Sequence, residues 1–419
     1  MRLVERHIIT KNNEEWKKID KLCFLSKNLY NQALYEIKKE YEKSRHFLRY
    51  GEMEKLLKNK EIQYNDFYKL PPNSSQQILM ILDKNLKSYF SLLRKWKSDK
   101  KSLSGCPMFP KYKHKIKGRN VIVFTSDNQV KLRNGYIKFP KKTNLKLVKT
   151  KINNLKQVRI IPQKSCYILE IVYEKKEKQN ELNSKKYIGI DLGVNNLTSI
   201  ISNVPGLKPF NINGRILKSI NQFYNKEKSI IQSQLIKNHN KYASNRLNKL
   251  ELKRNNIISN YLHNTSKYII NYCIANKIGN IIIGKNVNWK KNINIGKKNN
   301  QNFVQIPFNT LIKQIEYKSK LNGIEMKLVE ESYTSKIDHL SLEKMDTHDA
   351  YLGKRIKRGL FSSSSGITLN ADTNGSIGIL RKEIGDSFIT KINRGDVVSP
   401  VKVNPLLTTN TENYISVGG

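Results

Sequence analysis

The stretch KKYIGIDLGVNNL, residues Lys185 to Leu197, places a carboxylate at the end of an apolar run. Tyr187–Ile190 is typical of a short buried strand, and Asp191 and Gly193 interrupt it. A lone aspartate after such a strand is most often a turn former or a helix cap. It becomes a catalytic candidate when other acids end neighbouring elements of the same sheet. The function therefore depends on which acids accompany Asp191.

The composition of the chain predicts a polyanionic partner. Its 419 residues include 77 Lys and Arg but 34 Asp and Glu, which gives a formal net charge of +43. Basic residues run through the whole chain with tyrosines among them, as expected where phosphates are neutralised and bases are stacked. A codon bias toward Lys and Asn does not account for this excess of basic over acidic residues. We therefore expect the chain to bind nucleic acid.

The first half of the chain changes in character near Gly105. A strand is expected at 2–10, and a helical pattern follows from 13 to 96, with LPPNSS (70–75) between two helical stretches. After Gly105 a proline-broken basic segment leads to β-like runs such as NVIVFTS and YILEIVYE, which predict a small barrel or curled sheet. The first strand can join this sheet only if the helical region is an insertion.

From Tyr187 onward, strand patterns alternate with helical ones. The expected elements are the strand LTSIISN, a basic helical stretch at 213–276, a strand at 280–284, a helix at 308–321, a strand at 324–331 and an acid-bearing turn before a helix at 369–382. This alternation predicts a mixed α/β sheet with a site at one edge.

Asp191 and Asp372 are the natural members of an acid cluster at that edge. Two hard divalent cations need several oxygen ligands, which carboxylates supply together with substrate phosphates. The small neighbours Gly193, Ala371 and Gly375 would let a nucleic-acid backbone approach. Such a site requires a third acid.

Cysteine usage and hydropathy narrow the setting. Cys23, Cys106, Cys166 and Cys273 stand far apart with no CxxC, which argues against a disulfide framework and a structural zinc site. The N-terminal stretch lacks an apolar signal core, and no segment approaches the ~18 apolar residues of a membrane span. We expect a cytoplasmic protein of a bacterium, associated with the nucleoid when on DNA and making no membrane contact.

Several motifs resemble those of the TnpB family, the transposon-encoded RNA-guided DNA endonucleases related to type V CRISPR effectors. They are GIDLGVNNL, NQNFVQIPF, ESYTSK, GKRIKRGLF and NADTNGS, and the first half resembles the family more loosely through LPPNSSQQILMILDKNLKSYF and KSLSGCPMFPKYK. The resemblance implies a multidomain α/β plus β-barrel protein. Its parts would be an RNase H-like (RuvC) nuclease domain and a wedge β-barrel that carries an inserted helical recognition domain, with two Mg²⁺ ions and a guide RNA as cofactors.

The resemblance and the change of pattern together give expected domain bounds. These are a wedge domain at 1–12 and 104–180, a helical recognition domain at 13–103, a nuclease domain at 185–395 with an insert at about 333–362, and a C-terminal tail at 396–419. The insert has no cysteine where many members of the family carry a zinc ribbon. We therefore expect it to contain no zinc.

The chain also differs from the common family pattern at the second catalytic acid. Lys285 follows the strand at 280–284 where most members carry that acid, and a lysine cannot bind Mg²⁺. One branch of the family has its glutamate on the next strand, and here that strand ends in Glu330 and Glu331. Adjacent residues of a strand point to opposite faces, so only one of these acids can face the metals. By its position before SYTSK we choose Glu331, with Glu330 as the alternative.

Candidate nucleic-acid contacts fall in three segments. The resemblance suggests that the first group reads a short DNA motif beside the target, and basic character with an aromatic residue or a dense cation cluster indicates the other two. The groups are Ser75, Gln76, Gln77 and Lys84; Lys111, Tyr112 and Lys113; and Lys354, Arg355, Lys357 and Arg358.

Three functions remain open from the sequence. The first is an RNA-guided DNA endonuclease with Asp191, Glu331 and Asp372 as catalytic and metal-binding residues. The second is a nuclease-inactive RNA-guided repressor, and the third is a transposase that joins DNA strands. We favour the first, with a guide RNA from the transposon end, double-stranded and single-stranded target DNA as partners, and a monomer within the ribonucleoprotein.

Overall fold

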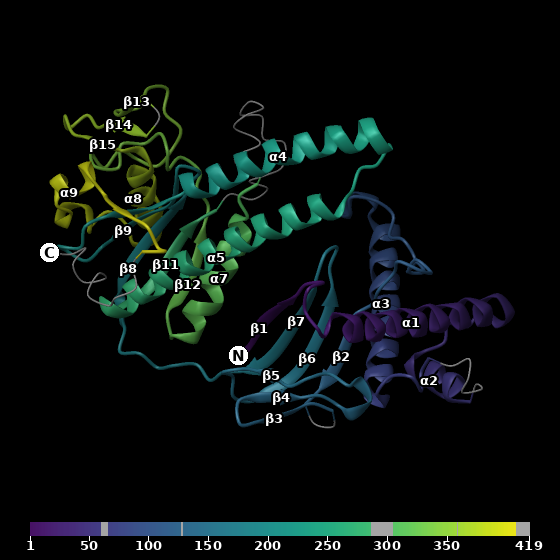
Figure 1. Cartoon of the computed structure of the whole chain (residues 1–419). Coiled ribbons are helices and arrows are strands. Elements are labelled where there is room, and N and C mark those ends of the chain that lie inside the picture. The colour runs from purple at the N-terminus through teal and green to yellow at the C-terminus, as the bar shows by residue number, and fades with distance from the viewer. Residues whose placement is uncertain (60–65, 127–128, 286–304, 358, 408–419) are drawn as a thin grey trace. The chain divides into compact units, whose positions relative to one another are not determined.

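The computed structural model describes residues 1–59, 66–126, 129–285, 305–357 and 359–407 (Figure 1). The chain forms two compact units, Met1–Lys175 and Lys176–Gly419. Each unit has buried apolar clusters of its own, so each is described by itself. Within the described residues, no helix combines the length and the apolar character needed to cross a membrane.

The first unit contains an antiparallel sheet with the strand order β1-β7-β6-β2 and a smaller sheet with the order β3-β4-β5. The bounds are β1 (Arg2–Ile9), β2 (Ile122–Thr125), β3 (Lys131–Arg133), β4 (Tyr136–Lys138), β5 (Val148–Lys149), β6 (Leu155–Pro162) and β7 (Tyr167–Glu174). β1 pairs with β7 along its whole length. The chain leaves this sheet after β1 and returns at β2, so the helices between them are inserted in it.

The inserted helices bury one apolar face against the larger sheet. They are α1 (Trp16–Ser44), α2 (Tyr50–Lys58) and α3 (Pro72–Ser98), and the 3₁₀ turns η2 (Lys100–Ser102) and η3 (Lys141–Thr143) complete the unit. α3 starts at Pro72, whose fixed φ suits a first helical turn. Ile78, Leu82 and Leu86 recur every four residues on one face of α3 and are buried in the same cluster as β2 and β6.

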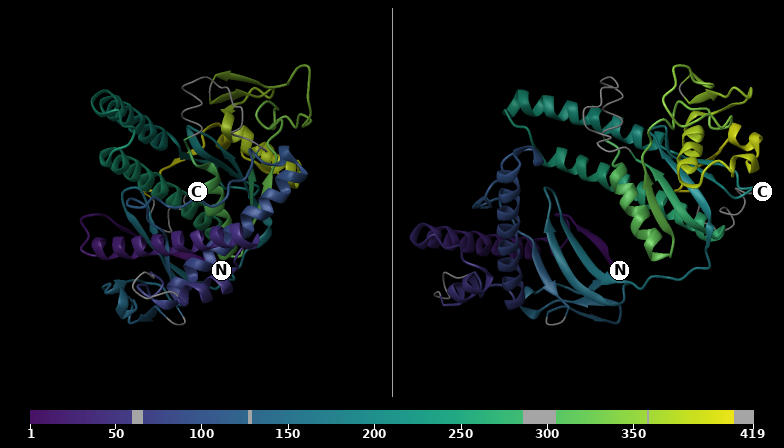
Figure 2. Two further views of the ribbon diagram at one scale, coloured as in Figure 1. Left: turned by 90° about the vertical axis from the view of Figure 1, so that its right-hand side faces the viewer. Right: turned by 180° about the vertical axis from the view of Figure 1, so that it is seen from behind.

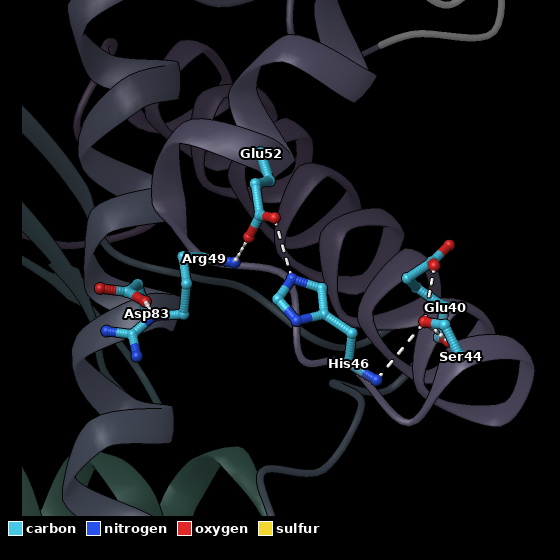
Figure 3. A network of polar contacts seen from close by, with 6 residues as sticks. All are labelled: Glu40, Ser44, His46, Arg49, Glu52 and Asp83. Atoms are coloured by element: carbon cyan, nitrogen blue, oxygen red, sulfur yellow. Dashed lines mark hydrogen bonds and ion pairs between the residues drawn. The ribbon is translucent and has the colours of Figure 1, made fainter.

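A polar network fixes the corner between α1 and α2 (Figure 3). Glu52 accepts a hydrogen bond from the Arg49 backbone N–H at 2.7 Å, and its other oxygen lies 2.8 Å from the His46 ring. The Arg49 side chain reaches Asp83 on α3 at 2.8 Å. These contacts tie the start of α2 to α3.

The second unit is built on a six-stranded sheet with the order β12-β11-β8-β9-β10-β16. The bounds are β8 (Asn183–Leu192), β9 (Asn196–Ser202), β10 (Phe210–Asn213), β11 (Ile278–Gly284), β12 (Glu325–Val329) and β16 (Val401–Val403). β8, β11 and β12 are parallel, β9 is antiparallel to both of its neighbours, and β10 is parallel to β16. The carboxyl ends of the three parallel strands therefore meet at one edge of the sheet.

Helices cover both faces of this sheet (Figures 1 and 2). On one face, Ile188 and Ile190 of β8 pack with α5 (Asn245–Ala275) and α7 (Phe308–Leu321). The other face carries α8 (Ala371–Ile384), which lies so close that a Cβ at Gly189 would be 2.7 Å from the Ser376 carbonyl oxygen. Because side chains alternate along a strand, Asp191 lies on the same face of the sheet as Gly189, toward α8.

The remaining elements surround this framework. α4 (Arg215–His239) runs beside α5, as both views of Figure 2 show. A small antiparallel sheet, β13 (Lys354–Lys357), β14 (Leu360–Ser362) and β15 (Thr368–Asn370), leads directly into α8, and η4 (Ile389–Lys391) and α9 (Arg394–Val398) follow it. The helical stretch expected at 213–276 is two helices, because α4 ends at His239 and the next residue, Asn240, has a left-handed conformation (φ 45°). The segment expected to be a C-terminal tail, 396–419, contributes β16 to the sheet.

Candidate functional site

Asp191 lies at the carboxyl end of β8, with its carboxylate against α8. A Cβ at Gly375 of α8 would lie 3.0 Å from Asp191 Oδ2, so the helix comes next to the carboxylate at a residue without a side chain. The side chain of Asp191 is only partly exposed. The turn after β8 and the glycine in α8 together give the carboxylate a narrow, enclosed position.

Asp372 lies in the first turn of α8, where the helix start is fixed by Asn370. The Asn370 side chain accepts hydrogen bonds from the backbone N–H groups of Asp372 at 3.0 Å and of Thr373 at 3.3 Å. Asn196 Nδ2 donates a 2.8 Å hydrogen bond to Asp372 Oδ2, and Arg355 Nη2 lies 4.0 Å from Asp372 Oδ1. The side chain of Asp372 is therefore oriented by an amide and faces a cation.

Glu331 follows β12 and its side chain lies over the end of β11. A Cβ added at Gly284, the last residue of β11, would lie 2.7 Å from both Cγ and Oε1 of Glu331. Lys382 Nζ donates to the backbone oxygens of Glu330 at 2.8 Å and of Ser332 at 2.6 Å, which fixes the backbone on either side of Glu331. Glu331 is half-buried and Glu330 is exposed.

Lys285 directly follows Gly284, and its backbone N–H donates to the Val329 carbonyl oxygen at 2.8 Å. This bond continues the pairing of β11 with β12 by one residue. The carboxyl group of Glu331 therefore lies over Gly284, the last residue of β11, where most members of the resembled family carry an acid one residue further on.

The electrostatics of this edge centre on Asp191. Burial raises the pKa of Asp191 well above its usual value, and the nearby charges of Asp372 and Glu331 raise it further. Burial raises the pKa of Glu331 to about 7, against an opposing effect of Lys382. Like charges in a partly buried site are costly unless a cation or proton offsets them.

The donor set suits a hard divalent cation. Carboxylate oxygens are the ligands that Mg²⁺ prefers, and three acids at one sheet edge supply them without any sulfur or imidazole. Among the residues that the structure describes, no group of three His, Cys, Asp or Glu side chains is already arranged to hold an ion.

Asn196 is a contact that the sequence did not predict. It lies within the same stretch as Asp191, on the far side of the turn at Gly193. This closeness in sequence was the one indication that Asn196 lies near the site. The contact itself joins residues 176 positions apart, Asn196 and Asp372, and depends on how β9 and α8 pack.

The residues expected to read DNA on α3 differ in their exposure. Ser75 is fully buried and its hydroxyl donates to the Phe67 carbonyl oxygen at 2.7 Å, so it offers no side-chain atom to a nucleic acid. It lies on the apolar face of α3, where the helix packs on the core. Gln76 donates to Glu54 at 2.8 Å, Gln77 is half-buried, and Lys84 is exposed.

The two basic clusters lie at the surface. Tyr112 is 44% exposed, with Lys38 Nζ 4.4 Å from its ring centroid, and Lys111 is exposed beside it. Lys113 is half-buried, and burial lowers its pKa. Lys354, Arg355 and Lys357 are exposed along β13, and Arg358 lies outside the described residues.

The cysteine-free insert is held by hydrogen bonds. Asp338 is buried and its Oδ2 accepts bonds from Ser363 Oγ at 2.8 Å, from the Ser364 N–H at 2.7 Å and from Ser364 Oγ at 2.9 Å. His339 lies 3.0 Å from Arg381 of α8, and burial lowers its pKa to about 4. Polar side chains thus link the insert to α8.

The fold and the acid cluster define a mixed α/β multidomain protein with carboxylates at one sheet edge. Two protein-family models match this chain: OrfB_IS605, described as a probable transposase, at residues 170–290, and the Cas12f1-like TNB domain at residues 308–379. No curated protein matches the sequence. The chain is thus similar to a transposase family in one part of its second unit and to a Cas12f1-like domain in another.

Solved structures of Cas12f proteins are similar to the chain. One is the Cas12f1–sgRNA–target DNA complex, with 16% identity and a TM-score of 0.50 over 87% of this chain and 81% of that one. A second, a CRISPR–Cas12f ternary complex, has 16% identity and a TM-score of 0.36 over 88% and 82% of the two chains. At such low identity the first match supports the multidomain fold alone.

Proposed function

We propose that the chain is an RNA-guided DNA endonuclease of a mobile element, cutting DNA beside a short flanking motif. The family similarity supports this proposal, since the similar Cas12f1 protein was solved with a guide RNA and target DNA. The net charge of +43 supports a nucleic-acid partner independently of that similarity. The second unit would be the RNase H-like nuclease domain, and the first would combine the wedge and recognition domains.

The observation that carries this proposal is the approach of three acids from separate segments. Asp191, Asp372 and Glu331 come from the end of β8, the start of α8 and the end of β12, and the last two raise the pKa of the first. A site that keeps mutually repelling carboxylates together is the arrangement expected where cations bind. These three residues would hold Mg²⁺, which when bound supplies Lewis-acid stabilisation of the charge on a scissile phosphate.

Other residues of the chain would keep the carboxylates in place. Asn196 fixes one oxygen of Asp372 by its 2.8 Å hydrogen bond and leaves the other oxygen toward Arg355. Lys382 holds the backbone around Glu331. The glycine at 375 leaves no side chain between α8 and Asp191, so the acids can approach one another and a DNA backbone.

The first unit would bind the guide RNA and read the flanking DNA. Lys111, Tyr112 and Lys113 offer cations and an aromatic ring for an RNA backbone and its bases. On α3, Gln77 and the exposed Lys84 are the stronger candidates for contact with the flanking motif, while sequence choice would come mainly from pairing between guide and target strand.

Lys285 supports an alternative, a nuclease-inactive RNA-guided DNA-binding repressor. A cation stands where most of the resembled family carries a second catalytic acid, and Glu331 must replace that acid for cutting to occur. If Glu331 does not serve this role, guide-dependent binding without cleavage is the remaining function.

Reconstitution distinguishes these functions. The chain would be expressed with the DNA that flanks its gene, the copurifying RNA sequenced, and the particle given a matching plasmid with Mg²⁺ or EDTA. We expect guide-dependent cutting with Mg²⁺ alone. Guide-dependent binding without cutting would support the repressor, and joined DNA strands would support a strand-transferring transposase.

A further inference from the structure

A polar cleft of about 800 Å³ opens on one side of Asp372, within the second unit. It lies away from Glu331, toward β10 and β16 of the sheet. The side chains that matter for its chemistry are Asn196, Asn211, Arg215, Arg355, Asp372 and Lys402. Three of these are cations and one is an acid, so the cleft has a positive balance beside the carboxylates.

The strand register connects this cleft to Asp191. Asp191 is opposite Ser199, Ser199 is opposite Asn211, and Asn211 is opposite Lys402. Residues directly opposite one another on paired strands point to the same face. Ser199 Oγ lies 3.5 Å from Thr373 of α8, which identifies that face as the one bearing the acids. At about 4.8 Å per strand, Lys402 lies about 14 Å from Asp191 along this row.

Asn211 is the unusual member of the row. Its residue is 3% exposed, and its Oδ1 has no hydrogen-bond partner among the residues that the structure describes. A buried amide oxygen without a partner is destabilising, and such a group calls for an explanation by a ligand or a function. Neighbouring positions of β10, Phe210 and Ile212, are buried in the apolar cluster on the opposite face. The sequence therefore places a polar side chain on the cleft side and apolar ones on the other.

The charges and the amide together define the ligand. Arg215 is the first residue of α4, so its guanidinium and the start of that helix both favour an anion. Arg355 and Lys402 are exposed cations of the same cleft. An amide offers a donor and an acceptor side by side, which matches the edge of a nucleobase and has no counterpart in a bare phosphate.

We propose that this cleft holds one unpaired nucleotide of the DNA strand next to the cut, with its base edge on Asn211 and its phosphates on Arg215 and Lys402. We assign an unpaired base because it offers the amide its pairing edge, which a duplex would occupy, as well as its groove edge. The cleft would thereby favour a single strand at the acids and fix the register of the cut. This subsite deepens the proposed nuclease function and depends on it for its role, but its binding can be measured without cleavage.

The test uses the guide-loaded full-length protein with Asp191→Asn, so that binding is measured without cutting. Single-stranded DNA oligonucleotides, each with one abasic nucleotide at a successive position, are titrated by fluorescence anisotropy against Asn211 and Asn211→Ala proteins. Losing a hydrogen bond to a base should weaken binding of the intact oligonucleotide by about three- to tenfold. At one position, the abasic oligonucleotide should bind both proteins equally.

Thr198→Val is the matched control. Thr198 also has a buried hydroxyl without a partner among the described residues, but on the neighbouring position of β9, whose side chain points away from the cleft. This variant should bind every oligonucleotide as the parent does. Lys402→Ala should weaken the binding of every oligonucleotide by the same factor and reduce the salt dependence of that binding, as the loss of a phosphate contact does.

Two results would overturn the subsite. The first is an Asn211→Ala protein that binds all oligonucleotides like its parent. The second is an Asn211→Ala protein whose loss of affinity is the same at every abasic position. A position-specific loss in a protein that never cuts DNA would keep the subsite and reject the nuclease function, so the two proposals fail separately.

Discussion

Two clusters of ionisable side chains contact the same helix, α8, and their aspartates have opposite pKa shifts. Asp338 belongs to the insert, and although burial raises its pKa, hydrogen bonds from Ser364 and Ser363 outweigh burial and lower it. Asp191 packs against Gly375, and both burial and two neighbouring acids raise its pKa. Hydrogen-bond donors surround Asp338, whereas Asp191 lies near two other carboxylates that raise its pKa.

The difference separates an acid that stabilises the fold from one that costs stability. Ionised Asp338 is stabilised by three hydrogen bonds of 2.7 to 2.9 Å to its Oδ2, as expected of a group that holds a loop in place. Ionised Asp191 is disfavoured by its surroundings, as expected of a group whose partner is a ligand. The predictions below test whether this contrast is one of function.

The largest expected effect is on cleavage by changes in Asp191 and Asp372. Asp191→Asn and Asp372→Asn each keep the shape of the side chain but remove the charge that a divalent cation needs, so we expect cutting to fall to background while guide-dependent DNA binding remains. Plasmid cleavage and electrophoretic mobility shifts measure the two. Asp338→Asn is the control and should still cut at low temperature. If Asp338→Asn, but neither of the other variants, lost cutting, the assignment of Asp338 to stability and of Asp191 to the site would be wrong.

The next effect distinguishes the two glutamates after β12. Glu331 lies over Gly284 and interacts with Asp191, whereas Glu330 is exposed and its backbone carbonyl is bonded to Lys382. We expect Glu331→Gln to abolish or strongly reduce Mg²⁺-dependent cutting and Glu330→Gln to leave the rate unchanged. The reverse outcome would assign the role to Glu330, and no effect of either change would favour the repressor.

Stability should respond in the opposite sense to activity. Asp338→Ala removes the carboxylate that accepts from the buried Ser363 hydroxyl and from the Ser364 backbone N–H, and losing such bonds to a charged group costs about 1–3 kcal/mol each, so we expect a clear fall in the free energy of unfolding. Asp191→Asn removes the repulsion among acids, and in EDTA it should raise the melting temperature. Scanning calorimetry of the metal-free variants measures both. A lower melting temperature for Asp191→Asn would mean that its carboxylate stabilises the fold.

The sequence predicted the elements that carry the acids better than the contacts among them. The apolar run before Asp191, the strand before Glu331 and the helix after Asp372 are recognisable from local pattern, and all three elements are present. The alternation of strands and helices predicted a mixed sheet with a site at one edge, but not the strand order that brings the acids there. Local pattern did not predict that Ser75 is buried, because its place on α3 depends on the sheet against which the helix packs.

Local sequence pattern could not predict the polar groups beside the acids, because these groups come together only through pairing of distant strands. Asn211 lies in NINGR, which is typical of a loop, and Lys402 lies in a segment expected to be a tail. Their pairing across β10 and β16 joins residues far apart in the chain, so only the register reveals the row. The hydrogen bond from Ser363 to Asp338 likewise joins residues 25 positions apart, and the insert shows no repeating sequence pattern from which this contact could be predicted.

A pH dependence follows from Glu331, whose folded-state pKa of about 7 exceeds the ordinary value of about 4.3. The folded protein then binds this proton more tightly than the unfolded chain, so the stabilisation is complete below about pH 4.3 and is lost as the pH rises through about 7. In EDTA, the free energy of unfolding of the wild-type protein, measured with urea, should fall relative to that of Glu331→Gln as the pH rises from about 4.3 to about 7. Glu330→Gln should follow the wild type. A difference that is constant with pH would contradict the shift.

The smallest expected effect concerns Lys285, next to the residue that Glu331 covers. Lys285→Glu would restore an acid at the end of β11, but the space over Gly284 is already taken by the Glu331 side chain, and a fourth carboxylate would add repulsion. We expect cutting at the wild-type rate or a few times slower, with lower stability in EDTA, as cleavage kinetics and calorimetry would show. Lys285→Gln is the matched control, because it removes the cation without adding an acid. A wild-type protein that is inert until Lys285→Glu is introduced would show that the acid was lost rather than relocated, and the contrast between the two clusters on α8 would then describe a former active site in a DNA-binding repressor.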